Sequence, residues 1–356
     1  MSLVAYFYWN PSPYIFNYSL PVIDRPLGWY GVLFALGFIM GYAIMIKLIT
    51  RELRIDGSFT PAHIAKWKAL MEKLQAASNN PIDPLHRVTR TLDLSKATKE
   101  EICAALIRTY DRSTLETLLP NIVMPINDVA FSMVDKGCWF VVAGAIIGAR
   151  LGHVFFYGWD YYRHHLSDIP KIWEGGLASH GGAIGILVAI FLFNNLIGKR
   201  SLPSFTFLRS IDLLAVPTAL AAFFIRLGNF FNQEIIGTVT DLPWGVLFGN
   251  PWEGGPALPR HPVQLYEGIF YLFLFFALLS MWRKGWHRQH SGVIAGTFFI
   301  AVFGWRILME FLKSPQGGLF ADSFLETGQM LSIPFVVIGL WLVFYPRLRQ
   351  YCSSCA

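Results

Sequence analysis

Residues 138–157 read CWFVVAGAIIGARLGHVFFY, and this stretch decides the class of the fold. Its only charged residue is Arg150. A helix rises about 1.5 Å per residue, so a stretch of this length spans the roughly 30 Å hydrocarbon core of a bilayer. Gly144, Gly148 and Gly152 recur at four-residue spacing, which lets helix backbones approach closely in lipid. The stretch therefore predicts a transmembrane helix that packs against a neighbour.

Six further stretches are long and apolar enough to span a bilayer. They lie at approximately 27–49, 179–197, 211–231, 263–282, 292–312 and 329–346. Over all 356 residues, 54% are hydrophobic and only 15% are charged. Soluble domains carry about 25% charged residues, so the composition argues against a soluble enzyme. We predict an all-α polytopic membrane protein with seven transmembrane helices.

The Lys and Arg residues near the helix ends set the predicted orientation. Eleven fall on one side of the predicted bundle and five on the other. Cytoplasmic loops carry the excess of basic residues, so we expect the N-terminus outside and the C-terminus in the cytoplasm. Topology thus accounts for most of the net charge of +6, and no nucleic-acid partner is expected.

Residues 51–135 interrupt the apolar pattern. They contain eleven Lys or Arg and eleven Asp or Glu, a density typical of soluble protein. Thr98 with Glu101, and Ser113 with Glu116, have the spacing of helix capping boxes, so we predict a helical cytoplasmic insertion. The other predicted parts are an outer segment with the first helix at 1–50, the six-helix remainder of the bundle at 136–346 with outer loops at 158–178 and 232–262, and a cytoplasmic tail at 347–356.

Polar side chains within the predicted spans need a reason, because a charge at the bilayer centre costs about 2.5–3.5 kcal/mol. Since successive helices run in opposite directions, all of these residues fall near the outer ends of their helices. Arg306, for example, lies about 9 Å below the end of its span. The set is Tyr30, Arg150, His153, His180, Arg226, Asn229, Asn232, Glu234, Arg260, His261, Gln264, Tyr266, Glu267, Arg306, Glu310 and Gln329. One shared depth indicates one site at the level of the outer headgroups.

Structural explanations stay open for several of these residues. Arg306 and Glu310 are four residues apart and could form a pair on one helix face. Asn229 and Gln264 could join neighbouring helices. Asp212, near the cytoplasmic end of its span, is interpreted as a cap of that same helix.

The residue types of this set favour a phosphate ligand. Arginine binds phosphate oxygens through two N–H groups at once and stays charged in a low-dielectric site, while His and Tyr offer proton transfer. We find no convincing metal-ligand spacing, nucleotide loop or serine nucleophile motif, so no metal or cofactor is expected. The four cysteines, Cys103, Cys138, Cys352 and Cys355, all fall on the predicted cytoplasmic side. The sequence predicts a site for an anionic phospholipid that opens toward the outer leaflet.

The same residues stand in blocks that carry a family resemblance. The blocks are WYG at 29–31, GARLG at 148–152, HGG at 180–182, RLGNFFNQE at 226–234, RHPVQLYE at 260–267, RILMEF at 306–311 and GQMLSIP at 328–334. Together they resemble the prolipoprotein diacylglyceryl transferase family over about three quarters of the chain. Two features depart from the family pattern: Val302 stands where the family has a tyrosine, and the insertion at 51–135 is absent from its compact form.

The resemblance implies an enzyme that moves the diacylglyceryl group of phosphatidylglycerol onto the lipobox cysteine of a prolipoprotein and releases glycerol phosphate. It implies a location in the bacterial cytoplasmic (inner) membrane, with the active site toward the outer leaflet, and no cofactor. The partners are phosphatidylglycerol, the prolipoprotein lipobox peptide and the lipid bilayer. Catalytic roles fall to His180, Arg226 and Arg306, and substrate-binding roles to Tyr30, Arg150, Asn229, Glu234, Gly237, Gln264, Tyr266, Glu267, Glu310 and Gln329.

The main alternative is a membrane transporter, or a non-catalytic lipid-binding protein, for anionic phospholipid. A transporter predicts polar residues through the membrane midplane and related repeats in the two halves. A metal-dependent alcohol phosphotransferase predicts clustered Asp residues within the spans. Neither pattern is present in the sequence, so the transferase is the favoured reading.

Overall fold

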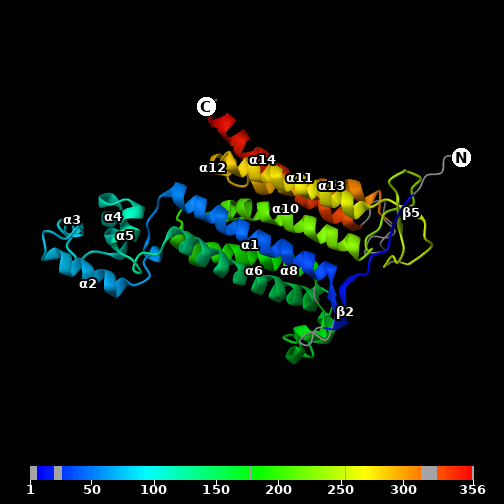
Figure 1. Ribbon diagram of the computed structural model, residues 1–356, viewed down its shortest axis with the longest axis horizontal. Helices are drawn as coiled ribbons and strands as arrows, with labels where there is room; N and C mark the ends of the chain where they lie inside the picture. The colour runs from blue at the N-terminus through cyan, green and yellow to red at the C-terminus, as the bar shows by residue number, and fades with distance from the viewer. Residues whose placement is uncertain are drawn as a thin grey trace. The chain divides into compact units, whose positions relative to one another are not determined.

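The computed structural model describes residues 6–19, 26–156, 158–176, 178–252, 254–313 and 327–354 (Figure 1). The chain forms two compact units. Unit 1 comprises residues 1–45 and 211–356, and unit 2 comprises residues 46–210. We describe each unit by itself.

Long apolar helices make up most of both units. Among the described residues, six are long and apolar enough to cross a membrane, so the chain is a multi-pass membrane protein. They are α1 (Trp29–Asp56), α6 (Ile126–Phe156), α8 (Ser179–Phe193) with its continuation to Ser201, α10 (Phe207–Phe231), α11 (Val263–Arg283) and α13 (Val293–Glu310). The predicted seventh span corresponds to α14 (Thr327–Ser354), whose apolar part, Gln329–Tyr345, is shorter. The seventh crossing and the orientation of the termini stay predictions.

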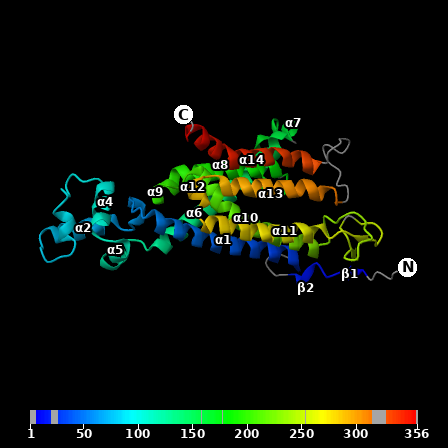
Figure 2. The ribbon, with the colours of Figure 1, turned by 90° about the horizontal axis from the view of Figure 1, so that it is seen from above.

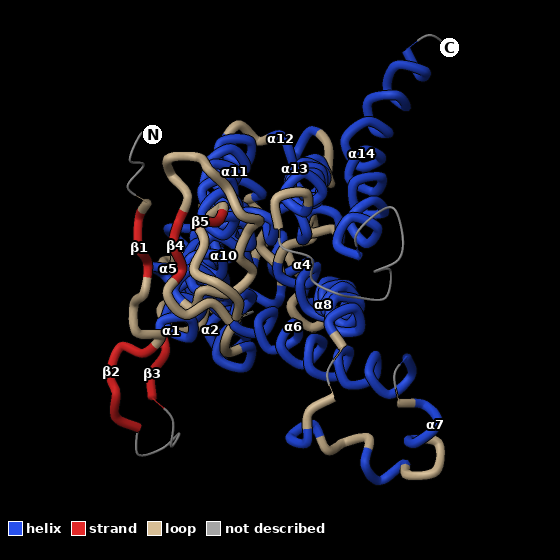
Figure 3. The backbone as a smooth tube through the Cα atoms, turned by 90° about the vertical axis from the view of Figure 1, so that its right-hand side faces the viewer, coloured by secondary structure: helices blue, strands red, loops and turns tan. Residues whose placement is uncertain are grey.

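The described residues are mostly helical, but they also include five short strands outside the long helices. Strand β1 (Phe7–Trp9) pairs in parallel with β4 (Val246–Phe248), which pairs antiparallel with β5 (Pro259–Arg260), as Figure 3 shows. Strand β2 (Tyr14–Ser19) pairs antiparallel with β3 (Pro26–Gly28). Aromatic and branched residues favour this conformation. The β1–β4 pair joins segments more than 200 residues apart, so no local pattern reveals it.

Small residues allow close helix contacts in unit 1. A Cβ atom added at Gly37 of α1 would lie 3.2 Å from the Ala221 Cα of α10. Helices α13 and α14 lie side by side (Figure 2), and there Gly296 meets Gly339. The short helix α12 (Trp286–Gln289) connects α11 to α13. These contacts hold α1 against α10 and α13 against α14.

Asp212 caps a different helix from the one expected. Its fully buried carboxylate accepts hydrogen bonds from the Gly292 N–H at 2.6 Å and from the Ala295 N–H at 2.8 Å. The prediction that it caps its own helix is therefore wrong. Asp212 lies inside α10, whereas the first-turn N–H groups of α13 have no partner within their helix and attract a carboxylate.

A glycine seam joins α6 to α8 in unit 2. A Cβ atom at Gly148 would lie 2.4 Å from the Gly181 carbonyl oxygen, and one at Gly144 would lie 2.6 Å from the Gly185 oxygen. A Cβ atom at Gly152 would lie 2.7 Å from the Gly181 Cα. The close packing predicted from the four-residue spacing is confirmed.

Helices α1 and α6 continue beyond their apolar parts, so the segment between them is 57–125 rather than 51–135. It contains a 3-10 turn (Pro61–His63) and the helices α2 (Trp67–Ser78), α3 (His86–Thr89), α4 (Lys99–Thr109) and α5 (Arg112–Leu118). Figure 1 shows this insertion at one end of α6. Leu70, Leu74, Leu106 and Leu115 are fully buried at its centre. The insertion therefore has a hydrophobic core of its own.

One of the two predicted capping boxes is confirmed. The Thr98 hydroxyl accepts from the Glu101 N–H, and the Glu101 carboxylate accepts from the Thr98 N–H. The box predicted at Ser113 is wrong, because Asp111 caps α5 and accepts from the N–H groups of Ser113 and Thr114. Aspartate and serine are equally good N-cap residues. Asp111 precedes Ser113 along the chain, so α5 begins directly after Asp111.

Two cysteine side chains lie among the described residues. Cys103 is buried in the core of the insertion, where burial raises the pKa of its thiol to about 12. Cys138 is exposed on α6. The side chains of Cys352 and Cys355 lie outside the described residues.

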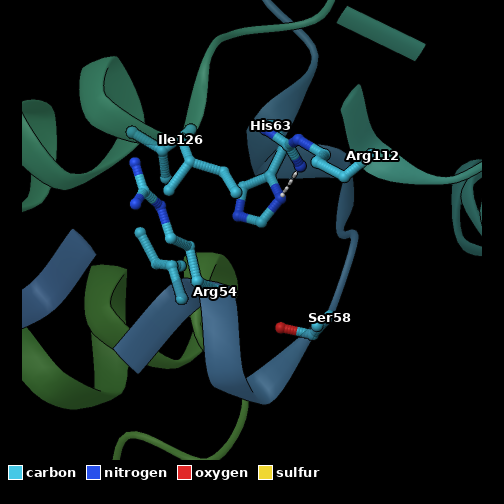
Figure 4. A pocket seen from close by; sticks show the side chains of 8 residues that line it. Arg54, Ser58, His63, Arg112 and Ile126 are labelled. Carbon is cyan, nitrogen blue, oxygen red and sulfur yellow. Dashed lines mark hydrogen bonds between the residues drawn. The ribbon is translucent and has the colours of Figure 1, made fainter. Parts of the chain in front are cut away.

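A small cavity of about 60 Å³ lies where the insertion meets the ends of α1 and α6 (Figure 4). His63 lines it and is 1% exposed. Its Nε2 lies 2.8 Å from the Ser201 carbonyl oxygen, so this nitrogen carries the proton. Its Nδ1 accepts from Arg112 Nη1 at 2.8 Å. Burial, and then the charge of Arg112, lower the pKa of His63 to about 4.

We expect the stability of unit 2 to fall between about pH 6.5 and pH 4. In this range the unfolded chain binds a proton at His63 and the folded chain does not, so unfolding is favoured as the pH drops. The shift corresponds to at most about 3 kcal/mol. Thermal unfolding of the wild type and of His63→Gln, measured from pH 7.5 to 4, tests this. The variant should lose less stability on acidification; equal slopes would contradict the assignment.

Candidate functional site

A network of charged side chains joins the ends of three helices in unit 1. Glu267, in the second turn of α11, is fully buried. One of its carboxylate oxygens lies 2.8 Å from Arg226 Nε of α10, and the other lies 3.0 Å from Lys313 Nζ. Lys313 also lies 3.4 Å from Glu310, at the end of α13. Because a buried carboxylate is costly without partners, Glu267 fixes these three elements to one another.

A second branch of the network leads from Arg226 to Glu234. Arg226 Nη1 donates to the Asn229 Oδ1 at 3.3 Å, and the Asn229 amide donates to the Glu234 carboxylate at 2.8 Å. Gln264 donates to the Glu234 main-chain oxygen at 2.7 Å. Asn229 therefore binds two charged side chains within α10 and the turn that follows it. Gln264 instead ties α11 to the main chain of that turn.

The chain turns sharply after α10 to bring Glu234 back onto Asn229. Gln233 and Ile235 have φ values of 53° and 57°, in the left-handed region. This conformation is strained for a β-branched residue such as Ile235. Gln233 is held on both sides: its amide donates to Asn10, and its Oε1 accepts from the Asn250 N–H at 2.8 Å. The strained backbone of this turn therefore brings the Glu234 carboxylate next to Asn229.

Two tyrosine side chains and a third cation lie next to this network, and we call the whole group the cluster. Tyr30 packs against Gly228, where a Cβ atom would lie 2.8 Å from its ring, and it interacts electrostatically with Glu234 and Arg226. Tyr271 of α11 hydrogen-bonds with Arg226 and interacts electrostatically with Arg306. The structure thus places Arg306 on the same side of the helices as Arg226.

The charges of this cluster are distributed unevenly. It holds three carboxylates, from Glu234, Glu267 and Glu310, and three cations, from Arg226, Arg306 and Lys313. Arg226 and Lys313 both bind Glu267. Within the part of the chain that the structure describes, no carboxylate lies within ion-pair distance of Arg306, and the expected pair with Glu310 is replaced by Glu310 with Lys313. Arg306 is therefore the cation whose charge is least compensated.

The remaining predicted residues of unit 1 lie close by. Gly237 has no room for a side chain, because a Cβ atom would lie 2.4 Å from the His261 oxygen, and it bridges to Lys313. The Tyr266 hydroxyl accepts from the Trp244 indole at 2.9 Å. Gln329 donates to the Ile307 oxygen at 3.2 Å, so it ties the start of α14 to the turn that carries Arg306.

Two predicted residues belong to unit 2. Arg150 is 4% exposed on α6, and it donates to main-chain oxygens of the 158–178 segment. His180 is the second residue of α8, and its side chain lies outside the described residues. Val302 occupies the turn of α13 before Arg306, where it offers no hydroxyl.

Two members of the cluster were not predicted as site residues. Lys313 follows Glu310 by three residues. In the sequence it contributes only to the asymmetry of Lys and Arg between the two sides of the bundle. Tyr271 follows Glu267 by four residues, on the same face of α11. The spacing to a predicted acidic residue was the available signal in both cases.

The chain is similar to known proteins over nearly its whole length. The family model for prolipoprotein diacylglyceryl transferase matches residues 120–345. A phosphatidylglycerol–prolipoprotein diacylglyceryl transferase of Protochlamydia amoebophila is 40% identical, over 99% of this chain and 98% of the relative. One of Chloroherpeton thalassium is 34% identical, over 97% and 96%.

A further relative with the same name matches a smaller part of the chain. The protein of Tolumonas auensis is 47% identical over 59% of this chain and 77% of its own length. The match to the family model likewise begins after α2–α5. The helices α2–α5 of the insertion therefore lie outside the part of the chain that the family model matches, as does α1.

Proposed function

This chain belongs to the prolipoprotein diacylglyceryl transferase family, and from this premise we propose how its residues serve the reaction. The enzyme transfers the diacylglyceryl group of phosphatidylglycerol to the cysteine thiol of a prolipoprotein. The thiol sulfur attacks the glycerol carbon next to the phosphate. A C–S bond forms, the C–O bond to the phosphate breaks, and glycerol phosphate leaves.

Arg306 and Arg226 bind the phosphate in this proposal. The observation that carries it is that Arg306 shares a cluster with Arg226 but, among the described residues, has no carboxylate in ion-pair distance. Negative charge grows on the leaving phosphate, and preorganised arginines stabilise it. Arg226 keeps N–H donors for this role, because Glu267, Asn229 and Tyr271 take only three of its five.

The thiol has to lose its proton before or during the attack. A cysteine with a pKa of about 8.5 is mostly protonated at neutral pH, so a base is required. We assign this role to His180, from its place in the HGG block at the start of α8. Tyr30, Asn229 and Glu234 form the polar surround of the glycerol headgroup, and Gly237, Gln264, Tyr266, Glu267, Glu310 and Gln329 support it.

The reaction can be tested directly. The purified protein is incubated with phosphatidylglycerol and a lipobox peptide that has one cysteine, and the peptide mass is measured. We expect a diacylglyceryl adduct that alkaline treatment converts to a glyceryl adduct, because alkali cleaves the two acyl esters and leaves the thioether, and no adduct on a Cys→Ser peptide. A wild-type protein that gives no adduct, where a known transferase gives one, would refute the assignment.

We propose further that the site opens toward the outer leaflet of the bacterial cytoplasmic membrane. The asymmetry of Lys and Arg supports this orientation. In a cysteine-free background, a membrane-impermeant maleimide should label Asp160→Cys in intact spheroplasts and should spare Ser95→Cys until the membrane is opened. Both positions are exposed, so the reversed labelling pattern would contradict the orientation.

We expect the enzyme to keep its activity without the insertion. Replacing residues 57–125 by a short Gly/Ser linker removes a segment that has its own core, and it leaves the cluster around Glu267 untouched. The transfer rate should stay within about threefold of the wild type, because none of the residues proposed for catalysis or substrate binding lies in the deleted segment and surface insertions are tolerated. Complete loss of transfer in a variant that elutes as a single folded species would contradict this.

A further inference from the structure

Arg150 uses its guanidinium group in an unusual way. It lies in α6 and is almost fully buried. Its hydrogen bonds within the described residues all go to main-chain oxygens: Nε to Ile169 at 2.7 Å, Nη2 to Asp168 at 2.7 Å, and Nη1 to Gly175 at 2.6 Å and Gly176 at 3.3 Å. Its guanidinium carbon also lies 5.1 Å from the centre of the Tyr162 ring. Four of its five donors are therefore engaged.

These acceptors all belong to the segment that connects α6 to α8. This segment contains α7 (Trp159–Tyr162) and two 3-10 turns (Leu166–Asp168 and Ile172–Glu174), and it lies at the opposite end of α6 from the insertion (Figure 1). Outside these elements its described residues have no regular secondary structure. Arg150 supplies donors to carbonyl groups that a helix or sheet would otherwise satisfy.

The path back from this segment to α8 runs directly over Arg150. Gly175 and Gly176 have φ values of 89° and 71°, which favour glycine. A Cβ atom at Gly176 would lie 2.8 Å from Arg150 Nη1. Two residues later, the Ala178 N–H donates to the Ala149 oxygen of α6 at 2.9 Å, and α8 begins at Ser179. Three residues shortly before His180 are therefore hydrogen-bonded to α6: Gly175 and Gly176 through Arg150, and Ala178 through Ala149.

We propose that Arg150 is a positioning residue that fixes the 158–178 segment and, through it, the start of α8 at His180. This rests on the proposed function, in which His180 is the base, and it replaces the substrate-binding role expected from the sequence. A phosphate ligand needs donors directed at the substrate, but the donors of Arg150 point at the protein's own backbone. Lysine cannot replace it, because one ammonium group does not reach carbonyls on three sides.

A second contact stiffens the segment independently of Arg150. The Asp168 carboxylate lies 2.7 Å from Lys171 Nζ and accepts from the Tyr161 hydroxyl at 2.6 Å. These contacts lower the pKa of Asp168 to about 2, so the carboxylate is ionised at every pH at which the enzyme is assayed. The segment should therefore keep its local turn when Arg150 is replaced and should come loose from α6 as a whole.

The test compares Arg150→Lys with Arg150→Gln. Both should lower kcat at least about tenfold and leave the KM for phosphatidylglycerol within about twofold, because orientation is lost while phosphate binding is kept. Trypsin should also cut faster after Arg163 and Lys171, which lie in the segment. A KM that rises in Arg150→Gln and returns in Arg150→Lys, with unchanged proteolysis, would overturn the proposal.

Gly176→Ala provides a second test that leaves the arginine in place. The added Cβ atom would lie 2.6 Å from the His153 ring and 2.8 Å from Arg150 Nη1, so it would force the segment away from both side chains of α6, and the same loss of kcat and the same faster proteolysis are expected. Gly254→Ala is the matched control: Gly254 also has a positive φ, but nothing lies within 4 Å of its added Cβ atom. If Gly176→Ala behaves like Gly254→Ala, the proposal is wrong. Proteolysis reads out the segment even if the wild type makes no adduct, so the two failures are distinguishable.

Discussion

Arg306→Gln should lower kcat/KM for diacylglyceryl transfer by about 10²- to 10³-fold, the usual cost of removing one preorganised donor from a developing anion. Arg306 is the cation of the cluster with no carboxylate in ion-pair distance among the described residues. Its positive charge is therefore available to the leaving phosphate. Arg226 shares its charge with Glu267, so Arg306 should contribute more to the transition state.

Helix α13 presents Arg306 rigidly, which is the reason to expect so large an effect. The neighbouring Trp305 ring stacks on Phe270 of α11, with 4.4 Å between centres and 7° between planes. Phe303 stacks on Phe335 of α14 with 4.3 Å between centres. Gln329 holds the main chain next to Arg306, at the Ile307 oxygen. A donor held in this way needs little reorganisation during the reaction.

The measurement is the rate of peptide lipidation at varied phosphatidylglycerol concentration. Arg306→Lys should recover part of the loss, because lysine keeps the positive charge but lacks the paired N–H donors of the guanidinium group. Arg283→Gln, an exposed arginine at the other end of α11, is the matched control and should be indistinguishable from the wild type. Wild-type kinetics in a folded Arg306→Gln protein would exclude the proposed role.

Gly148→Val should prevent unit 2 from folding stably. The first carbon of any side chain at Gly148 would lie 2.4 Å from the Gly181 carbonyl oxygen, which is main chain and cannot turn away. Helices α6 and α8 would have to separate along the seam, at a cost above the about 1–3 kcal/mol of ordinary overpacking. We expect little folded protein, measured by size-exclusion chromatography in detergent, and a lower Tm for what remains.

Alanine substitutions give the controlled form of this comparison. Gly148→Ala gains about 1 kcal/mol of helix propensity and still meets the Gly181 oxygen, so it should be destabilising. Gly304→Ala on α13 gains the same propensity and meets nothing within 4 Å, so it should be neutral or stabilising. Equal Tm values for the two variants would show that the Gly181 oxygen does not limit the size of the residue at position 148.

The sequence alone predicted the features that depend on the bilayer. Apolar stretches gave the positions of all seven long helices to within a few residues at most ends. The four-residue glycine spacing predicted the α6–α8 seam, and the alternating helix direction predicted that polar residues would gather at one end. These inferences succeed because lipid imposes the same length and the same polarity on every span.

Contacts between distant segments decided the rest. The β1–β4 pair, the cap that Asp212 supplies to α13 and the contact of Lys313 with Glu267 all join residues that no local pattern connects. The insertion also proved shorter than its charge density suggested, because α1 and α6 continue as helices after their apolar parts end.

What the sequence by itself determined, then, was a multi-pass helical protein and its family, while the residues of its site stay a prediction. Only the tertiary structure distinguished the three arginines: Arg226 is paired with Glu267, Arg150 binds main-chain oxygens, and Arg306 has no carboxylate in ion-pair distance among the described residues. The residue type gives each arginine the same charge and the same donors. Its role follows from which acceptors the fold brings within about 3 Å of the guanidinium group, and that depends on segments far away along the chain.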